Sequence, residues 1–282
     1  LEKEEAGGIG RDVKETDKSG LERNINKVTI IDCLGHMTKT QRNGFEEYTK
    51  EHSPNAIFFD VDKNSKSDND LPHRVTDIKS WEKIMGDMGI ENNDRIVVYD
   101  NSDVISSCRC WYNLIYYGHD PKLVHVLDGG LKKWKKENKS TDKKEVTTKT
   151  SKYTCKENTK LVKNKKQIDE NLDLREFNVI DARSRERFEG KVAEPRKGLR
   201  SGSIKNSFCL PFSELINEDH TFFSKDKILK KFNSLKFDHN KNIVFSCGSG
   251  VTASVLALAY SLINAKYMPT IYDGSWAEYG KN

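Results

Sequence analysis

The sequence predicts an α/β protein built from two similar domains, each a mainly parallel sheet with helices on both faces. Short apolar runs rich in β-branched residues alternate with stretches of helical length, which is the pattern of buried parallel strands joined by helices. The same order of elements then occurs a second time along the chain. A length of 282 residues also exceeds one ordinary core and suits two domains.

The first copy of this pattern occupies residues 28–137. Its expected strands are the runs 29–32, 55–60, 95–100 and 123–127, with a helix expected over 109–117. An Asp-Gly-Gly turn at 128–130 and Trp134 close this copy.

The second copy occupies residues 161–282 and repeats the elements in the same order. Its expected strands are 178–181, 206–211, 242–247 and 270–272, with a helix over 251–265. Asp273 and Gly274 take the place of the earlier Asp-Gly turn. Because this alignment sets Asp100 opposite Cys247, only the second copy has a thiol at this strand end, and we expect the first domain to be inactive.

Two further segments lie outside the expected domains. Residues 1–27 hold seven acids and six bases without an apolar stretch, so we expect a mobile tail and not a signal or transit peptide. Residues 138–160 are expected to form a solvated Lys-rich linker, since fourteen lysines and four acids fall between Leu131 and Lys166. That segment could attract RNA or another polyanion, but it lacks the arginines and interleaved aromatics of a nucleic-acid surface.

Composition excludes several classes of protein. No apolar run reaches the length of a membrane-spanning helix, so no membrane partner is expected. The six cysteines show neither a disulfide framework nor zinc spacing, and Cys108 and Cys110 supply only two of the four ligands that zinc takes, so we expect no metal. We expect a cytoplasmic protein. A mitochondrial one is the alternative, because a chain that starts at Leu1 could have lost a targeting segment upstream.

Cys247 is the main candidate for chemistry. It lies where a predicted strand passes into a predicted helix, in a loop with Gly248 and Gly250. Such glycines allow successive N–H groups to turn inward, and the N-terminus of the helix adds a positive dipole, so both features favour a thiolate. The alternative is a buried cysteine of the core, because free cysteines are among the most buried residues.

Four motifs then carry a resemblance to a family: CGSGVTA at 247–253, YDGSWAEY at 272–279, LDGGLKKW at 127–134 and FFDVD at 58–62. Together they resemble the tandem-domain rhodaneses, and among these the 3-mercaptopyruvate sulfurtransferases, over residues 28–282. The resemblance implies two rhodanese-like domains, an active cysteine in the second domain, and no cofactor. The chain departs from the usual His-Ile-Pro-Gly-Ala turn by placing Asn55 and Asn206 at the glycine, and asparagine tolerates a positive φ there.

The loop residues bear on the choice of substrate. Related phosphatases have a clamping arginine six residues after the cysteine, and Ala253 stands there in this chain, which argues against phosphate as substrate. Thiosulfate sulfurtransferases that resemble this chain carry cationic side chains in the loop, whereas Gly248 and Ser249 are uncharged. A mercapto acid with its charge farther from the sulfur, such as 3-mercaptopyruvate, fits better; thiosulfate is the alternative.

The resemblance also assigns roles to other residues. Arg187 and Arg196 match the family's substrate-binding arginines, and a guanidinium fork suits an α-keto acid, although both could be ordinary surface arginines. Ser249, His73 and Asp62 match a relay that moves protons during catalysis, although each could instead be a plain turn or cap residue.

The expected reaction has two halves. Cys247 takes sulfur from 3-mercaptopyruvate, pyruvate leaves, and a persulfide is held by the N–H groups of Gly248, Ser249, Gly250, Val251 and Thr252. Thioredoxin, a small thiol or cyanide then accepts the sulfur. Two rival functions are a persulfide carrier in tRNA thiolation or cofactor assembly, which needs a protein donor, and a rhodanese-like interaction module without activity.

Overall fold

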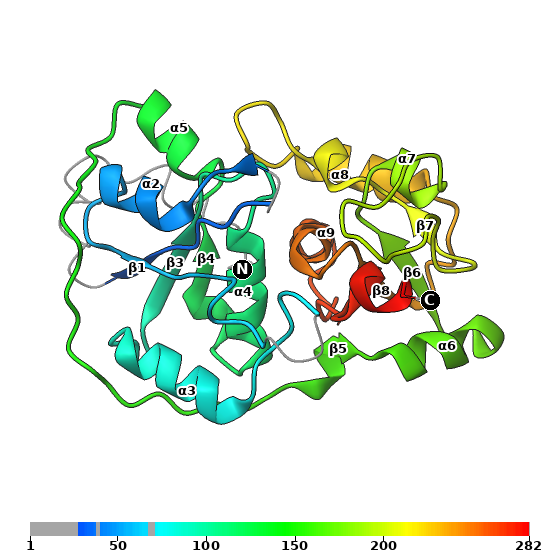
Figure 1. Cartoon of the computed structure of the whole chain (residues 1–282), viewed down its shortest axis with the longest axis horizontal. Coiled ribbons are helices and arrows are strands. Elements are labelled where there is room, and N and C mark those ends of the chain that lie inside the picture. The colour runs from blue at the N-terminus through cyan, green and yellow to red at the C-terminus, as the bar shows by residue number, and fades with distance from the viewer. Residues whose placement is uncertain (1–27, 38–39, 67–70, 282) are drawn as a thin grey trace, which may run out of the picture. The chain divides into compact units, whose positions relative to one another are not determined.

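Every ladder between the named strands is parallel in the computed structural model, which describes residues 28–37, 40–66 and 71–281. The tail expected at residues 1–27 lies outside this range. The chain divides into two units (Figure 1). Unit 1 holds residues up to 64, 76–158 and 218–221, and unit 2 holds 65–75, 159–217 and 222–282.

Unit 1 contains a four-stranded sheet in the order β2-β1-β3-β4. The strands are β1 (Val28–Asp32), β2 (Ala56–Phe58), β3 (Arg95–Tyr99) and β4 (Val124–Val126). Its helices are α2 (Gly44–Lys50), α3 (Ile78–Asp87), α4 (Ser107–Tyr116) and α5 (Gly130–Lys136), with a 3-10 turn η5 (Pro121–Leu123).

Helices cover both faces of this sheet. On one face, Tyr48 of α2 and Leu131 of α5 pack in a buried cluster with Tyr99 of β3. Toward the other face, Trp81 of α3 stacks on Tyr117, which directly follows α4, with ring centroids 4.4 Å apart. Figure 1 shows α4 alongside β3 and β4. Because both faces are covered, the strands read as continuous apolar runs.

Unit 2 contains a five-stranded sheet in the order β5-β9-β8-β6-β7. The strands are β5 (Val162–Lys163), β6 (Phe177–Asp181), β7 (Phe208–Cys209), β8 (Asn242–Ser246) and β9 (Ile271–Tyr272). The helices are α6 (Lys165–Leu174), α7 (Arg185–Phe188), α8 (Lys225–Asn233), α9 (Val251–Ile263) and α10 (Ser275–Tyr279), with 3-10 turns η6 (Thr159–Leu161) and η7 (Phe212–Leu215).

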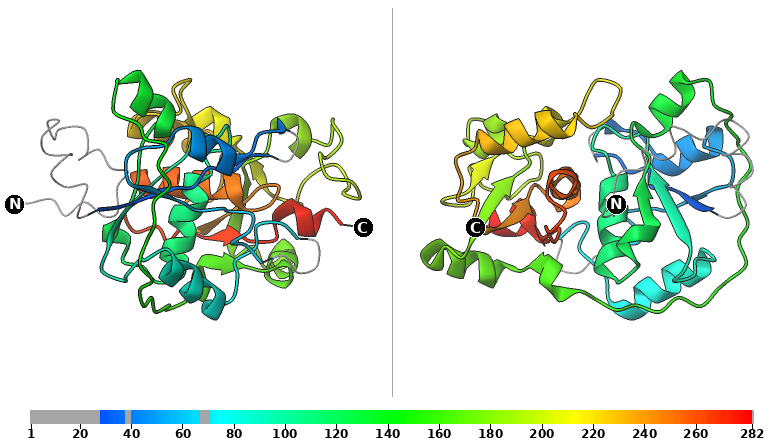
Figure 2. Two further views of the ribbon diagram at one scale, coloured as in Figure 1. Left: turned by 60° about the vertical axis from the view of Figure 1, so that its left-hand side comes forward. Right: turned by 180° about the vertical axis from the view of Figure 1, so that it is seen from behind.

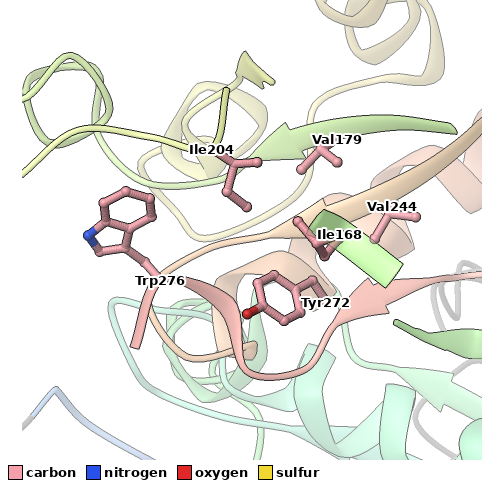
Figure 3. Close-up of a cluster of buried hydrophobic side chains, with 6 residues drawn as sticks. All are labelled: Ile168, Val179, Ile204, Val244, Tyr272 and Trp276. Carbon is pink, nitrogen blue, oxygen red and sulfur yellow. The ribbon is translucent and has the colours of Figure 1, made fainter. Parts of the chain in front are cut away.

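The strand β8 shows how this sheet buries both of its faces. Val244 belongs to a cluster with Ile168 of α6 and Trp276 of α10, which Figure 3 displays together with Val179, Ile204 and Tyr272. The next residue, Phe245, contacts Phe232 of α8 and Tyr260 of α9 by its ring edge. Successive side chains of a strand point to opposite faces, so the layers on the two sides differ. The two views of Figure 2 show α8 and α9 in this unit.

The structure confirms the predicted duplication. Strand order β2-β1-β3-β4 in unit 1 matches β7-β6-β8-β9 in unit 2, and unit 2 adds β5. Asp100 follows β3 as Cys247 follows β8, and the backbone carbonyl of each accepts an N–H bond of 2.9 Å, from Leu131 and from Trp276 respectively. Asn55 and Asn206 adopt the expected left-handed conformation, with φ of 62° and 64°.

The Lys-rich segment differs from the solvated linker that its composition predicts. Residues up to 158 belong to unit 1, and backbone bonds of 2.9 Å join Ser151 to Gly86 and Lys156 to Tyr117. Tyr153 is buried, and its hydroxyl forms a 3.1 Å hydrogen bond with Nδ1 of His119. Most of its lysines are exposed, but a buried aromatic ring, main-chain bonds and side-chain bonds, such as that from the Ser151 hydroxyl to the Ile90 carbonyl at 2.7 Å, attach the segment to the domain. Across the described residues, no helix is both long and apolar enough to span a membrane.

The domain boundaries also differ from simple halves of the sequence. Residues 65–75 come from the first half but group with unit 2, and 218–221 come from the second half but group with unit 1. In unit 1 the Lys132 ammonium donates to the Glu218 carbonyl at 2.7 Å. Each unit therefore contains a short segment from the other half of the chain.

The loop after β3 in unit 1 encloses a carboxylate of the chain itself. Oδ2 of the buried Asp100 accepts hydrogen bonds from the hydroxyls of Ser102 and Ser106, at 2.8 and 3.0 Å, and from the N–H of Ser107 at 3.2 Å. Burial raises the pKa of Asp100 in spite of these donors. This loop of unit 1 corresponds to the Cys247 loop of unit 2. Its hydrogen-bond acceptor is the fixed carboxylate of Asp100.

Asp32, in the same core, predicts a dependence of stability on pH. Burial, aided by the charge of Asp100, raises its pKa from 3.8 to about 7. The folded state therefore holds a proton that the unfolded state has lost, and the free energy of unfolding falls as pH rises from about 4 to 7, by up to about 4 kcal/mol. Asp32→Asn keeps the oxygen that accepts the Leu34 N–H, so we expect this variant to gain stability at pH 8 and little at pH 4.

Thermal unfolding of wild type and Asp32→Asn at pH 4, 6 and 8 measures the effect. The exposed Asp77, whose pKa is lowered by hydrogen bonds from Ser80, provides a control, because Asp77→Asn should not produce this gain. The prediction would be contradicted if the unfolding temperatures of wild type and Asp32→Asn changed with pH in the same way.

Candidate active site

The Cys247 side chain lies in a turn between β8 and α9. Its Sγ accepts the N–H of Gly250 at 3.1 Å and the N–H of Ser249 at 3.4 Å. Gly250 is the residue before α9 and has φ of 83°, the left-handed region in which glycine is favoured. Only 2% of Cys247 is exposed. Burial alone would fit the core-cysteine alternative, but a core thiol has no need of two inward N–H donors.

The turn that begins α10 holds this cysteine in place. The N–H of Cys247 donates to Oγ of Ser275 at 3.1 Å, and the Ser275 hydroxyl donates to the Tyr272 carbonyl at 2.8 Å. The N–H groups of Trp276 and Ala277 donate to the carbonyls of Cys247 and Gly248, both at 2.9 Å. The backbone around the nucleophile is therefore fixed on both sides by the Asp-Gly-Ser-Trp motif.

Two arginines converge on Gly248. A Cβ atom placed on this glycine would lie 3.3 Å from Nη2 of Arg187 and 3.5 Å from Nη1 of Arg196. Nη2 of Arg196 also lies 3.5 Å from Oγ of Ser249. Two cationic forks beside one loop can bind the adjacent oxygens of a keto acid.

Arg187 is oriented by a buried network of charges. Glu194 accepts Nε and Nη2 of Arg187 at 3.2 and 2.6 Å, and accepts Nη1 of Arg183 at 2.8 Å. Arg183 in turn makes a bidentate pair with Asp181, at 3.0 and 2.7 Å from its Oδ2. Burial works against the charge of Arg183, but Asp181 and Glu194 raise the pKa of its guanidinium. Charges therefore alternate from Asp181 to Arg187.

Trp276 packs against this network. The Cζ atoms of Arg183 and Arg200 lie 4.4 and 4.6 Å from the centroid of its ring, distances typical of cation–π contacts. Its indole N–H donates to the Arg200 carbonyl at 2.9 Å. Figure 3 shows Trp276 at the end of the hydrophobic cluster. This ring connects the core of unit 2 with the arginine network.

The His73 side chain lies within hydrogen-bond distance of Ser249. Its Nδ1 is 2.8 Å from the Ser249 hydroxyl oxygen, and both residues belong to unit 2. A serine hydroxyl bonded to an imidazole can pass a proton in either direction. Asp62 belongs to unit 1, and its part in the relay stays a prediction.

The remaining predicted residues lie at the start of α9. Val251 and Thr252 form its first turn, where N–H groups have no partner within the helix. Sequence reasoning missed Glu194 and Ser275, and it treated Asp273 as a turn residue. The recurrence of Asp-Gly after the last strand of each copy was the available signal for the motif, whereas no repeated pattern marked Glu194.

Comparison with known proteins agrees with the two-domain fold and the site described above. A sequence model of the Rhodanese-like domain matches residues 18–137 and again residues 164–282. The chain belongs to the rhodanese family. The two matches correspond to the two copies read from the sequence, so this is a rhodanese with tandem domains.

Relatives of this rhodanese come from plants, mammals, fungi and bacteria. The "Thiosulfate/3-mercaptopyruvate sulfurtransferase 1, mitochondrial" of Arabidopsis thaliana is 34% identical over 271 residues, which cover 89% of this chain and 71% of that protein. The 3-mercaptopyruvate sulfurtransferase of Escherichia coli K12 is 31% identical over 257 residues, covering 90% and 89%. The crystal structure of SseA from Escherichia coli, titled as a 3-mercaptopyruvate sulfotransferase, matches with a TM-score of 0.82, 28% identity, and 92% and 97% of the two chains covered.

Proposed function

We propose that this chain is a 3-mercaptopyruvate sulfurtransferase, an enzyme that carries sulfur on Cys247 as a persulfide and releases pyruvate. The observation that carries the proposal is the arrangement around Gly248. The guanidinium groups of Arg187 and Arg196 lie beside this glycine, and the neighbouring Sγ of Cys247 accepts two N–H groups of the loop. The 3-mercaptopyruvate sulfurtransferases among the relatives support the same donor.

The first half of the reaction forms the persulfide. Arg187 and Arg196 hold the carboxylate and carbonyl of the donor, and the Cys247 thiolate attacks the donor's sulfur. A sulfur–sulfur bond forms, the carbon–sulfur bond breaks, and its electron pair passes to the carbon as the enolate of pyruvate. The proton that leaves the donor thiol returns to that carbon, and Ser249 with His73 is the route for it, with Asp62 as the proposed third member.

The second half returns the enzyme to its thiolate. The negative persulfide is stabilised by N–H groups of Gly250 and Ser249, with those of Gly248, Val251 and Thr252 as further donors. An acceptor thiolate attacks the outer sulfur and leaves Cys247 reduced. We propose thioredoxin or a small thiol as acceptor, and the cytoplasm or, as one relative's name suggests, the mitochondrion as location.

Thiosulfate is the second candidate donor, because one relative bears both substrates in its name. Steady-state assays with 3-mercaptopyruvate, thiosulfate and a persulfidated protein as donors separate the possibilities. We expect the highest kcat/KM with 3-mercaptopyruvate. A higher value with thiosulfate would reassign the donor, a higher value with the protein donor would favour a persulfide carrier, and no turnover with any would favour an interaction module.

Arg187→Gly should mainly impair the use of 3-mercaptopyruvate. Loss of a charged hydrogen bond to the donor lowers kcat/KM about 10- to 100-fold, with the larger part in KM. Arg185, two residues earlier on α7, pairs with Glu214 and is half exposed, so Arg185→Gly is a matched control with little expected effect. An Arg187→Gly enzyme with unchanged kcat/KM would refute the carboxylate role.

A further inference from the structure

Asp273 contacts the segment that carries His73. This buried residue directly follows β9, and its Oδ2 accepts the N–H of Val75 at 3.1 Å and Nε of Arg74 at 3.4 Å. The carboxylate is 2% exposed and the Arg74 side chain 29% exposed. A single oxygen thus anchors the two residues after His73.

The conformation of His73 needs such an anchor. Its φ of 62° is in the left-handed region, which costs a residue other than glycine conformational free energy. The residue after His73 is held by a backbone bond of 2.9 Å from the Lys66 N–H to the Arg74 carbonyl. The bond from the Val75 N–H to Asp273 holds the next residue, and the Nδ1 atom of His73 lies 2.8 Å from the Ser249 hydroxyl oxygen.

The same short turn also fixes the nucleophile. Ser275 accepts the Cys247 N–H, and Trp276 donates to the Cys247 carbonyl, within three residues of Asp273. A five-residue stretch, 273–277, therefore contacts both the cysteine loop and the His73 segment. The relative positions of Cys247 and His73 therefore depend on this one short segment of the chain.

We propose that Asp273 is a positioning residue, which sets His73 against Ser249 by holding the backbone N–H of Val75 and the side chain of Arg74. This inference rests on the proposed function, because it gives His73 a part in proton transfer. Asp273 itself exchanges no proton with the substrate. Its effect is to keep the imidazole within hydrogen-bond distance of the hydroxyl at the moment of transfer.

A double-mutant cycle tests the inference. With 3-mercaptopyruvate as donor, Asp273→Ala and His73→Gln should each lower kcat about 10-fold or more, and the double variant should be within about 3-fold of His73→Gln alone. The pH profile of kcat/KM for Asp273→Ala should lose the limb that His73→Gln also loses. Effects that multiply in the double variant, or a profile lowered evenly without change of shape, would overturn the proposal.

Three further variants separate positioning from general damage. Asp273→Asn keeps an oxygen for the Val75 N–H and should recover most of the activity. Arg74→Ala removes only the partly exposed arginine from the contact with Asp273. This variant tests the contact if Asp273→Ala does not fold. Glu278→Gln alters a carboxyl of the same motif that accepts the Tyr272 hydroxyl and does not contact residues 74–75, so its kcat should stay near wild type.

Hydrogen exchange of the Val75 amide reports the anchor without any catalysis. Asp273→Ala should speed this exchange, whereas Glu278→Gln should not. If wild type fails to turn over 3-mercaptopyruvate, the proposed function falls while the exchange result still tests the anchor. If turnover is normal and the Val75 amide exchanges equally in wild type and Asp273→Ala, the anchor falls and the proposed function stands.

Discussion

Cys247→Ser is expected to abolish sulfur transfer, with kcat/KM for 3-mercaptopyruvate lower by about 10³-fold or more. A serine hydroxyl at this position is neither ionised near neutral pH nor able to hold a sulfur atom as a persulfide. The Sγ contacts with Ser249 and Gly250 involve backbone N–H groups, and a hydroxyl oxygen can accept them equally well. The fold should therefore survive the change, and thermal unfolding should stay close to wild type.

Cys209 is the matched control for this experiment. It lies in the same unit and is more exposed than Cys247, but burial and the charge of Asp181 raise its pKa to about 12. It is a protonated thiol at neutral pH, so Cys209→Ser should keep activity. Mass spectrometry after incubation with donor alone should place the added sulfur on the Cys247 peptide, and a persulfide on Cys209 together with an active Cys247→Ser enzyme would reverse the assignment.

Glu194→Ala should cause the second large effect, a loss of stability of about 3 to 5 kcal/mol. Its side chain is 1% exposed and accepts hydrogen bonds from Arg183 and Arg187, so alanine leaves the buried Arg183 with Asp181 as its remaining acidic partner and removes the carboxylate that pairs with Arg187. Because Arg187 then loses its fixed direction beside Gly248, KM for 3-mercaptopyruvate should rise as well.

Glu214 offers a matched comparison, since it too joins two cations, Arg185 and Lys231, but at the surface. Glu214→Ala should cost at most about 1 kcal/mol, because water solvates the freed cations. Denaturant unfolding of both variants gives the two free energies. Equal losses would mean that burial of the Glu194 network adds nothing to the stability of unit 2.

The sequence predicted those parts of the molecule that depend on local patterns. The strand before Cys247, the glycines of its loop and the helix after it are contiguous, so hydrophobic runs and glycines were enough to locate them. The equivalence of Asp100 and Cys247 followed from repetition of the same order of elements. The positive φ of Asn55 and Asn206 followed from the tolerance of asparagine for left-handed turns.

Features that depend on distant contacts could not be predicted in this way. Glu194 lies on an irregular loop, and nothing in its neighbours indicates that it joins Arg183 to Arg187. The attachment of residues 138–158 to unit 1 depends on backbone bonds, which any sequence can make, on the buried ring of Tyr153, and on scattered side-chain bonds such as that from the Cys155 N–H to Glu82. Composition reports the lysines of that segment and not these contacts.

The loop around Asp100 differs from the Cys247 loop in what its hydrogen-bond donors hold. In the second half, the loop donors face a sulfur atom that, in the proposed reaction, gains and loses an outer sulfur with each turnover. In the first half they hold a carboxylate that is part of the chain, so this loop is always filled. The Asp100 carboxylate thus fixes the conformation of this loop, and replacing Asp100 by cysteine would remove these hydrogen bonds before it created a catalyst.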